Sequence, residues 1–187
     1  MQNTIKQYDA EIEKCKSIFL KKFQDYGAAW RILRPSSLTD QLYIKACRIR
    51  SIEEKGMRKV NEPIDLEYRA LVNYGIMALI QLELGENDDM SMNKHDVEQN
   101  FDKHAAIAKE LMMNKNHDYG EAWRDMRIGS ITDLILMKLL RAKKIEENEG
   151  RTIISEGIDA NYLDIMNYAL FALIKIEENK IVKTEKT

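Results

Sequence analysis

The sequence contains few of the residues that interrupt helices. Among its 187 residues there are only two prolines and eight glycines. Gly27, Gly56, Gly85, Gly120 and Gly150 each follow a stretch in which apolar residues recur with the period of an α-helix, and glycine is the usual residue at a left-handed helix end. No stretch alternates polar and apolar residues in the rhythm of a half-buried strand. These absences predict an all-α protein.

Disulfide and zinc-binding patterns are also missing. The two cysteines, Cys15 and Cys47, form neither a spaced pair nor a zinc motif and lie in helix-periodic stretches, so we expect reduced, buried thiols. The three histidines, His95, His104 and His117, form no HExxH motif. We expect all three on the surface.

Long apolar stretches and an excess of basic charge are absent as well. The longest apolar stretches are broken by Asn73 or Asn167 and are too short to cross a bilayer, and the N-terminal residues show no signal-peptide core. The net charge is −2, whereas nucleic-acid-binding proteins are usually basic. We expect a soluble, cytoplasmic protein with no membrane partner, and nucleic acid is disfavoured. The oligomeric state stays open, a homo-oligomer included.

The chain does contain an internal repeat. Residues 25–31 (DYGAAWR) return as residues 118–124 (DYGEAWR), and the longer stretches 25–54 and 118–147 are identical at half of their positions. After a shift of one residue the match continues through the last helix-periodic segment of each half. A repeat sets the architecture, and polar residues that are identical in both copies are candidates for a structural or functional role.

The repeat unit contains three predicted helices. Each half reads as a helix, the DYGxAWR connector, a second helix, a loop and a third helix. Such a unit leaves much apolar surface uncovered, so two units should pack about a pseudo-two-fold axis into one helical bundle. The expected helices are residues 4–24, 38–55, 65–84, 94–116, 131–149 and 159–180. The expected organisation is a first repeat at 1–85, a linker at 86–93, a second repeat at 94–180 and a frayed tail at 181–187.

Some repeated residues have a plain structural explanation. Ser37 and Asp40 recur as Ser130 and Asp133, with the S-x-x-acid spacing of a capping box that closes a first helical turn. A role for the aspartates in an active site is the alternative.

The repeated tryptophans, Trp30 and Trp123, are expected to plug the junction between helices. Stacking against a nucleotide base is the alternative role for them.

The connector is explained less well by structure alone. A lysine precedes it in both copies, giving K-x-x-D-Y-G at Lys22 and Lys115, and a helix end needs the glycine but not the other residues in fixed order. The arginines that follow, Arg31 and Arg124, suit bidentate contacts to carboxylate or phosphate. A buried Asp–Arg tie that holds the turn is the alternative for them.

The next helix of each repeat carries a pair of cations on one face. Lys45 and Arg48 lie three residues apart, as do Lys138 and Arg141. Such a pair, aligned with an apolar isoleucine one turn further on, suits the mouth of an anion pocket.

The third helix of each repeat is apolar all round except for one asparagine, Asn73 or Asn167. A buried asparagine needs hydrogen-bond partners, so we expect both to bond to groups outside their own helix. In the second repeat, Asp164 lies one turn before Asn167, which suggests a corner of a Mg²⁺ site. A polar network between the halves is the alternative. In the first repeat Ala70 replaces the aspartate.

These motifs, K-x-x-D-Y-G, S-x-x-D followed by K-x-x-R, and D-x-x-N-Y, resemble the nucleotide-modification-associated domain family, found in bacteria and in phages that rework their nucleotide pools. The resemblance covers nearly the whole chain, once per repeat. The family is distantly similar to the MazG-like all-α pyrophosphohydrolases, which hold Mg²⁺ with acidic residues and cleave a nucleoside triphosphate to monophosphate and pyrophosphate. This chain carries fewer carboxylates than those enzymes at the matching positions.

The resemblance and the motifs together imply a nucleotide-binding protein of nucleotide-pool or nucleotide-modification metabolism. One interpretation is a Mg²⁺-dependent nucleoside triphosphate pyrophosphohydrolase in which Asp164 and Glu146 are catalytic and hold the metal, so that the chemistry belongs to the second repeat. The alternative is a non-catalytic nucleotide-binding or scaffold module. The expected nucleotide-binding residues are Lys115, Asp118, Tyr119, Trp123, Arg124, Lys138, Arg141 and Asn167 in the second repeat and Lys22, Asp25, Tyr26, Trp30, Arg31, Lys45, Arg48 and Asn73 in the first.

Overall fold

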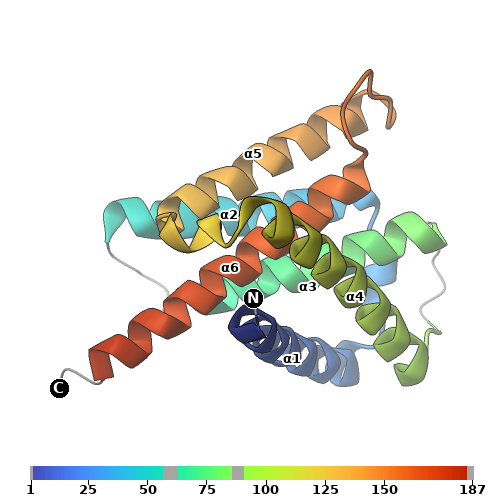
Figure 1. Ribbon diagram of the computed structural model, residues 1–187. Coiled ribbons are helices and arrows are strands. Elements are labelled where there is room, and N and C mark those ends of the chain that lie inside the picture. Colours follow the sequence, from blue (N-terminus) through green and yellow to red (C-terminus); the bar gives the residue numbers. More distant parts are fainter. Residues whose placement is uncertain (1, 57–62, 86–90, 185–187) are drawn as a thin grey trace.

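The computed structural model describes residues 2–56, 63–85 and 91–184, with residues 182–184 as backbone only (Figure 1). These residues form six α-helices and two 3₁₀ turns, and none of them lies in a strand. Both halves run in the order long helix, 3₁₀ turn, helix, helix, which confirms the predicted all-α tandem repeat. The elements are α1 (Gln2–Tyr26), η1 (Ala29–Ile32), α2 (Pro35–Lys55), α3 (Ile64–Leu84), α4 (Lys94–Tyr119), η2 (Ala122–Asp125), α5 (Ile128–Glu147) and α6 (Ile158–Thr184).

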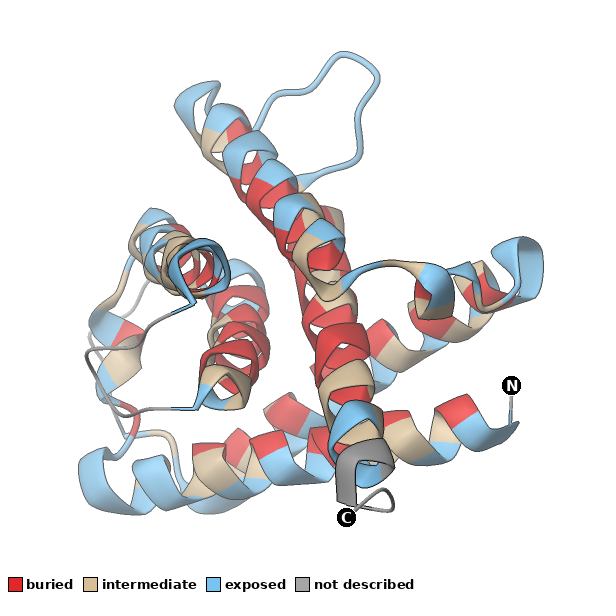
Figure 2. Ribbon diagram, turned by 90° about the vertical axis from the view of Figure 1, so that its left-hand side faces the viewer, coloured by how far each residue is buried: buried red, intermediate tan, exposed pale blue. Residues whose placement is uncertain are grey.

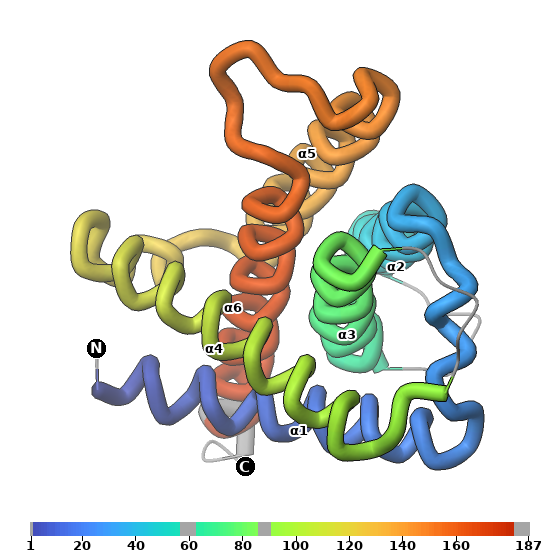
Figure 3. Tube along the Cα trace, turned by 90° about the vertical axis from the view of Figure 1, so that its right-hand side faces the viewer, coloured from blue at the N-terminus to red at the C-terminus, as the bar shows by residue number. Residues whose placement is uncertain are grey.

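The two repeats share a single hydrophobic core. Helix α2 packs on α3 and α5 packs on α6, and the two pairs join through α3 with α6 and α2 with α5. Helices α1 and α4 cross this four-helix centre, and each contacts both α3 and α6 (Figure 3). Buried residues gather on the faces where the helices meet (Figure 2). Gly75 permits a close approach of α3 to α6, because a Cβ atom there would lie 2.6 Å from Cγ of Met166.

The helix ends differ in part from the prediction. The five glycines expected at helix ends all have positive φ. The capping boxes at Ser37 and Ser130 are wrong, because α2 already begins at Pro35, whose fixed φ favours the first helical position, and α5 begins at Ile128. The aspartates of these motifs pair across the repeats instead, as Asp40–Lys143 and Asp133–Arg50, the latter at 3.6 Å.

Other expectations are corrected or extended by the structure. His104 is buried rather than exposed, with Nε2 3.2 Å from Oε2 of Glu83, and burial lowers its pKa. Cys15 is fully buried and burial raises the pKa of its thiol to about 12, whereas Cys47 is only half-buried. The last helix continues to Thr184, past its expected end, and residues 86–90 of the expected linker and 185–187 of the expected tail lie outside the described residues. No described helix has the length and apolar character that crossing a membrane requires.

Two matching sets of hydrogen bonds join the repeats through the core. In each, a threonine of one repeat donates to a glutamate of the other, and a buried tyrosine bonds to the same threonine. Thr39 lies 2.6 Å from Oε1 of Glu146 and 2.5 Å from the Tyr162 hydroxyl. The counterparts are Thr132 with Glu53 at 2.9 Å and Thr132 with Tyr68 at 2.7 Å. Glu146, which the sequence suggested as catalytic, is therefore part of a tie between the halves.

Burial raises the pKa of Glu146 and of Glu53, although the threonine and tyrosine hydroxyls act in the opposite direction. The folded protein therefore holds protons on these carboxyls more tightly than the unfolded chain does. Linkage then requires that their contribution to stability is fully present below the unfolded pKa, near 4.5, and falls as the pH rises through the folded pKa.

We expect Glu146→Gln to leave the melting temperature at pH 7 unchanged or higher, and to reduce the loss of stability above pH 4.5. Glutamine keeps an oxygen that accepts from Thr39 but removes the half-buried charge. The measurement is thermal unfolding from pH 4 to pH 8. Glu147→Gln is the control, since Glu147 is exposed and Lys144 lowers its pKa. A marked loss of stability for Glu146→Gln at pH 7 would contradict this account.

The two asparagines are buried and bond to neighbouring helices, as predicted. Asn73 Nδ2 donates to the carbonyl of Cys15 at 3.1 Å, and Asn167 Nδ2 donates to that of Ala108 at 3.0 Å. Only Asn167 has a second partner, because the hydroxyl of Tyr8 donates to its Oδ1 at 2.7 Å. The Oδ1 of Asn73 has no hydrogen-bond partner among the described residues.

We expect Asn167→Ala to reduce the free energy of unfolding by about 1–3 kcal/mol, since it removes two buried hydrogen bonds and leaves the buried hydroxyl of Tyr8 without its acceptor. Asn73→Ala should cost less, because only one hydrogen bond is lost. Urea denaturation measures both. Tyr8→Phe, which removes the partner of Asn167 Oδ1, should cost an intermediate amount. An equal loss in the free energy of unfolding for the two asparagine variants would contradict the importance of the second hydrogen bond of Asn167.

Candidate functional site

Each repeat places a buried carboxylate against two cations, but only in the first repeat are these cations the predicted pair. In the first repeat, Glu67 of α3 lies against both cations of α2 and is only 2% exposed. Nζ of Lys45 forms an ion pair with Oε2 of Glu67 at 3.2 Å, without a hydrogen bond to that oxygen. Arg48 donates a hydrogen bond to Oε1 of the same carboxylate. The cation pair therefore faces the bundle rather than lying on a solvated helix surface.

The second repeat uses a different carboxylate. Asp164 of α6 is 4% exposed and pairs with Lys138 of α5 at 2.6 Å and with Lys115 of α4. Burial acts to lower the pKa of Lys115, but the hydrogen bond and charge of Asp164 outweigh it, so that the pKa is raised. Asp164 thus pairs with two of the residues expected to bind phosphate, Lys115 and Lys138.

The two carboxylates occupy different positions in the repeat. The counterpart of Glu67 in the second repeat is Asn161, and the counterpart of Asp164 in the first is Ala70. As a result, Lys22 forms no ion pair within the described part of the chain, whereas its counterpart Lys115 does. The cations that lack a described carboxylate partner are therefore at different positions in the two repeats.

In the first repeat, the space beside Ala70 is an open groove. Two adjoining cavities of about 310 and 390 Å³ share Lys22 and Tyr74 in their walls. The end near Ala70 is cationic, and the end near the connector is aromatic. We define the first-repeat groove by Phe19, Lys22, Tyr26, Trp30, Lys45, Ala70, Asn73 and Tyr74, which come from α1, η1, α2 and α3.

The repeated tryptophans also differ: the one in the first repeat is more exposed than the one in the second. Trp123 is 6% exposed and stacks on Phe171, with ring centroids 4.3 Å apart. In the first repeat Met77 stands where the second has Phe171. Trp30 is only half-buried, is tilted against Phe19 and borders the groove. The core role predicted for the tryptophans holds for Trp123, while Trp30 presents part of its ring to the groove.

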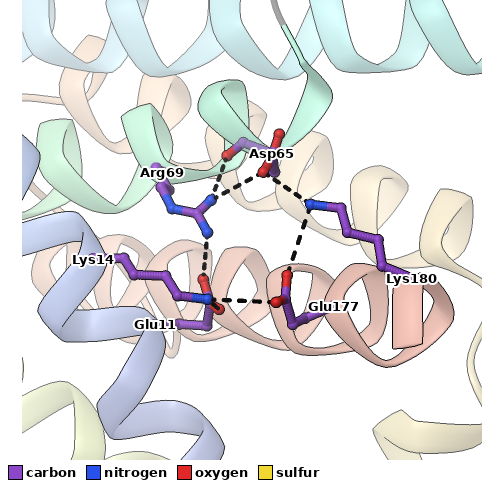
Figure 4. A network of polar contacts seen from close by, with 6 residues as sticks. All are labelled: Glu11, Lys14, Asp65, Arg69, Glu177 and Lys180. Carbon is purple, nitrogen blue, oxygen red and sulfur yellow. Dashed lines mark hydrogen bonds and ion pairs between the residues drawn. The ribbon is translucent and has the colours of Figure 1, made fainter. Parts of the chain in front are cut away.

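Two polar groups in the groove wall differ in their availability. Asn73 is 7% exposed and its Oδ1 has no described partner. Arg69 is committed to a network that joins α1, α3 and α6, in which it lies 2.9 Å from Glu11 and 3.5 Å from Asp65 (Figure 4). The network also contains Lys14, Glu177 and Lys180.

The repeated arginines of the connector lie in structural ties. Arg31 is 4% exposed and donates to Oε1 of Gln81 near the end of α3 and to the carbonyl of Gly85. Arg124 lies 2.8 Å from both Glu121 and Glu178 and also donates to Thr4 and Gln7 at 2.7 Å. Both arginines therefore tie the connector to neighbouring segments, but neither bonds to the aspartate of its own DYG element, as the alternative interpretation expects.

The aspartate and tyrosine of each DYG element are exposed. Tyr26 is 71% and Tyr119 is 77% exposed, and the described contacts of these four residues are few. Asp25 has no described partner, and Asp118 lies 3.1 Å from His117. Since folding places little demand on these side chains, their identity in both copies indicates a role at the surface.

The described side chains do not fit the predicted magnesium site. Both oxygens of Asp164 face lysine ammonium groups, and Glu146 accepts from Thr39 and Tyr162. In the structure both carboxylates therefore have protein partners at the oxygens that a metal ion would need. No group of three or more carboxylate, histidine or cysteine side chains suited to a metal occurs in the parts of the chain described above. We derive no chemical step through a metal ion.

The sequence prediction missed Glu67, Asn161 and Tyr8. A search for polar residues identical in both copies discards positions at which the copies differ. Glu67 and Asn161 are such a position, and Ala70 and Asp164 are another. A comparison of charged residues that differ between the copies would have found the first pair.

Comparison with known proteins agrees with the repeat. The model of the family described as nucleotide modification associated domain 1 matches residues 22–82 and again residues 115–176. No curated protein and no solved structure matches the chain. The similarity to MazG-like pyrophosphohydrolases has no support in these comparisons and stays a prediction. The two matches start at Lys22 and Lys115 and together cover most of the chain, which therefore belongs to the nucleotide modification associated domain 1 family.

Proposed function

We propose that the protein binds a phosphorylated nucleoside in the first-repeat groove. The main support is that Ala70 stands where the second repeat has an aspartate. Lys22 therefore lacks a carboxylate partner among the described residues and lies beside an open cavity. In this arrangement Lys22 and Lys45 contact phosphate, and the exposed face of Trp30 borders the base.

The size and lining of the groove support this proposal. Ligand pockets for small molecules usually measure about 300–1,000 Å³ and combine apolar walls with a few polar groups. The cavities of about 310 and 390 Å³ have aromatic walls at Phe19, Trp30 and Tyr74. An aromatic ring stacks on any base, at roughly 1–3 kcal/mol per base. The unpaired Oδ1 of Asn73 is an acceptor for a hydroxyl or amino group of the ligand.

The family description supports a nucleotide ligand, and the side chains support binding more than hydrolysis. Pyrophosphate cleavage of the kind attributed to MazG-like enzymes requires several carboxylates around Mg²⁺, and the groove contains Glu67, which is already paired with Lys45 and Arg48. We therefore propose a nucleotide-binding module of nucleotide modification. Mg²⁺-dependent turnover in the second repeat, with Asp164 and Glu146 as its residues, is the second candidate, and it requires Asp164 to release the lysines that its two oxygens face.

Thermal unfolding with a panel of nucleoside mono-, di- and triphosphates, with and without Mg²⁺, tests the function. A ligand present at about 100 times its dissociation constant adds about 2.7 kcal/mol to the free energy of unfolding, so a rise in melting temperature is expected for at least one nucleotide. Product analysis of the same mixtures tests turnover. The absence of any shift across the panel would overturn the proposal, and Mg²⁺-dependent product formation that Asp164→Asn abolishes would favour the second candidate.

We expect Ala70→Asp to weaken nucleotide binding by at least about tenfold, or ~1.4 kcal/mol. The new carboxylate would reproduce the Asp164 arrangement and pair with Lys22 and Lys45. Ala70→Asn is the matched control, because it fills the same space without the charge and should retain most of the affinity. Calorimetric titration measures both variants. Equal losses would show that space, rather than charge, limits binding.

Substitution of the two equivalent lysines locates the site. Lys22→Ala should weaken nucleotide binding several-fold while hardly changing the melting temperature, because the exposed Lys22 makes no described ion pair. Lys115→Ala should leave binding unchanged and lower the melting temperature slightly, since it removes a partner of buried Asp164. The reverse pattern of affinities would place the nucleotide in the second repeat.

A further inference from the structure

The second repeat contains a cavity of about 480 Å³ at a different place from the first-repeat groove. It lies between the C-terminal half of α5, the segment 148–157 and the start of α6. Its charged and polar lining includes four cations and one carboxylate. We define the second-repeat pocket by Lys138, Arg141, Lys144, Arg151, Glu156 and Asn161, together with Ile145, Ile153 and Ile154.

The central cation of this pocket lacks the partner that its counterpart has. Arg48 of the first repeat pairs with Glu67, but the position of Glu67 is occupied by Asn161 in the second repeat. Asn161 is 4% exposed, lines the pocket and donates to the carbonyl of Gly157 at 2.8 Å. Arg141 consequently forms no ion pair within residues 2–56, 63–85 and 91–184.

No carboxylate of the pocket, Glu156 included, forms an ion pair with Arg141 among the residues that the structure describes. Lys138 is 8% exposed and lies 2.6 Å from Asp164, which also pairs with Lys115. Lys144 and Arg151 pair with exposed glutamates next to them in sequence, Glu147 at 2.9 Å and Glu149. Such exposed pairs contribute little and are readily exchanged for a stronger anion.

We propose that the second-repeat pocket binds the phosphate group of a second phosphorylated ligand, independently of the first-repeat groove. Arg141 would make the bidentate contact that a guanidinium offers to phosphate, with Lys144 and Arg151 around it. The apolar side chains of Ile153 and Ile154 are 100% and 95% exposed beside the pocket, and they provide surface for the non-phosphate part of the ligand. The protein then has two anion sites of different construction.

The test is a titration of the whole protein with inorganic pyrophosphate, followed by two-dimensional NMR of the backbone amides. We expect shift changes concentrated at residues 138–161, and the same changes in Ala70→Asp, in which the first-repeat groove is blocked. Changes confined to the first-repeat groove, or no saturable changes at all, would overturn the inference. Retention of the pyrophosphate response in Ala70→Asp separates this inference from the proposed function.

Two variants test the role assigned to the missing carboxylate. Asn161→Glu restores the residue that the first repeat has at this position, and it should weaken pyrophosphate binding at least about tenfold by pairing with Arg141. Asn161→Gln is the neutral control and should bind like the parent. Arg141→Gln should weaken pyrophosphate binding as much as Asn161→Glu does. It replaces Asn161→Glu as the test if that variant does not fold. Binding that survives Arg141→Gln, or survives Asn161→Glu in a folded protein, would exclude this pocket as the site.

Discussion

A buried carboxylate held against two cations is the interaction on which the differences between the two repeats depend. A carboxylate inside a helical bundle is costly to desolvate, and Glu67 and Asp164 are each buried against lysine or arginine side chains that offset this cost. The helix face on which the carboxylate sits decides which cations are neutralised. Moving it by one turn of α3 or α6 changes the surface that remains for a ligand, without changing the fold around it.

The fold itself depends on contacts that cross between the repeats. Each threonine–glutamate–tyrosine set joins α2 of one half to α5 of the other, and α1 and α4 each contact both central helices. An isolated repeat would expose the faces of α3 or α6 that now meet at Gly75 and Met166. The two repeats are thus halves of one cooperative unit rather than two linked domains.

Much of the fold follows from local signals in the sequence. Helical periodicity and glycine placement predict the six helices, and the apolar context of Asn73 and Asn167 predicts their burial and their bonds to other helices. The capping-box spacing at Ser37 predicts too late a start for α2, because the proline two positions earlier already favours the first helical position. The burial of His104 depends on how α4 lies against the end of α3, where Glu83 meets it, and no local pattern contains that information.

The candidate site was less predictable than the fold. Sequence identity between the copies points to Lys22, Lys45 and Trp30 as candidates. It does not reveal which of these side chains are available to a ligand, because that depends on the residues that face them from α3. Arg31 and Arg124 are as well preserved between the copies as the lysines, yet they are hydrogen-bonded to neighbouring segments. Identity between the two copies therefore does not distinguish a residue kept for its structural hydrogen bonds from one kept for ligand binding.

The covalent connection of the two repeats has a consequence for how such sites arise. A symmetric dimer of one short chain would carry the same residue at both equivalent positions, so any change that opens a groove in one subunit would open it in the other. Joining the copies in one chain removes that restriction. Ala70 can then stand opposite Asp164, and Glu67 opposite Asn161, within one molecule. Within one chain the two halves can thus become chemically unequal, while the threonine–glutamate–tyrosine sets that join them stay matched.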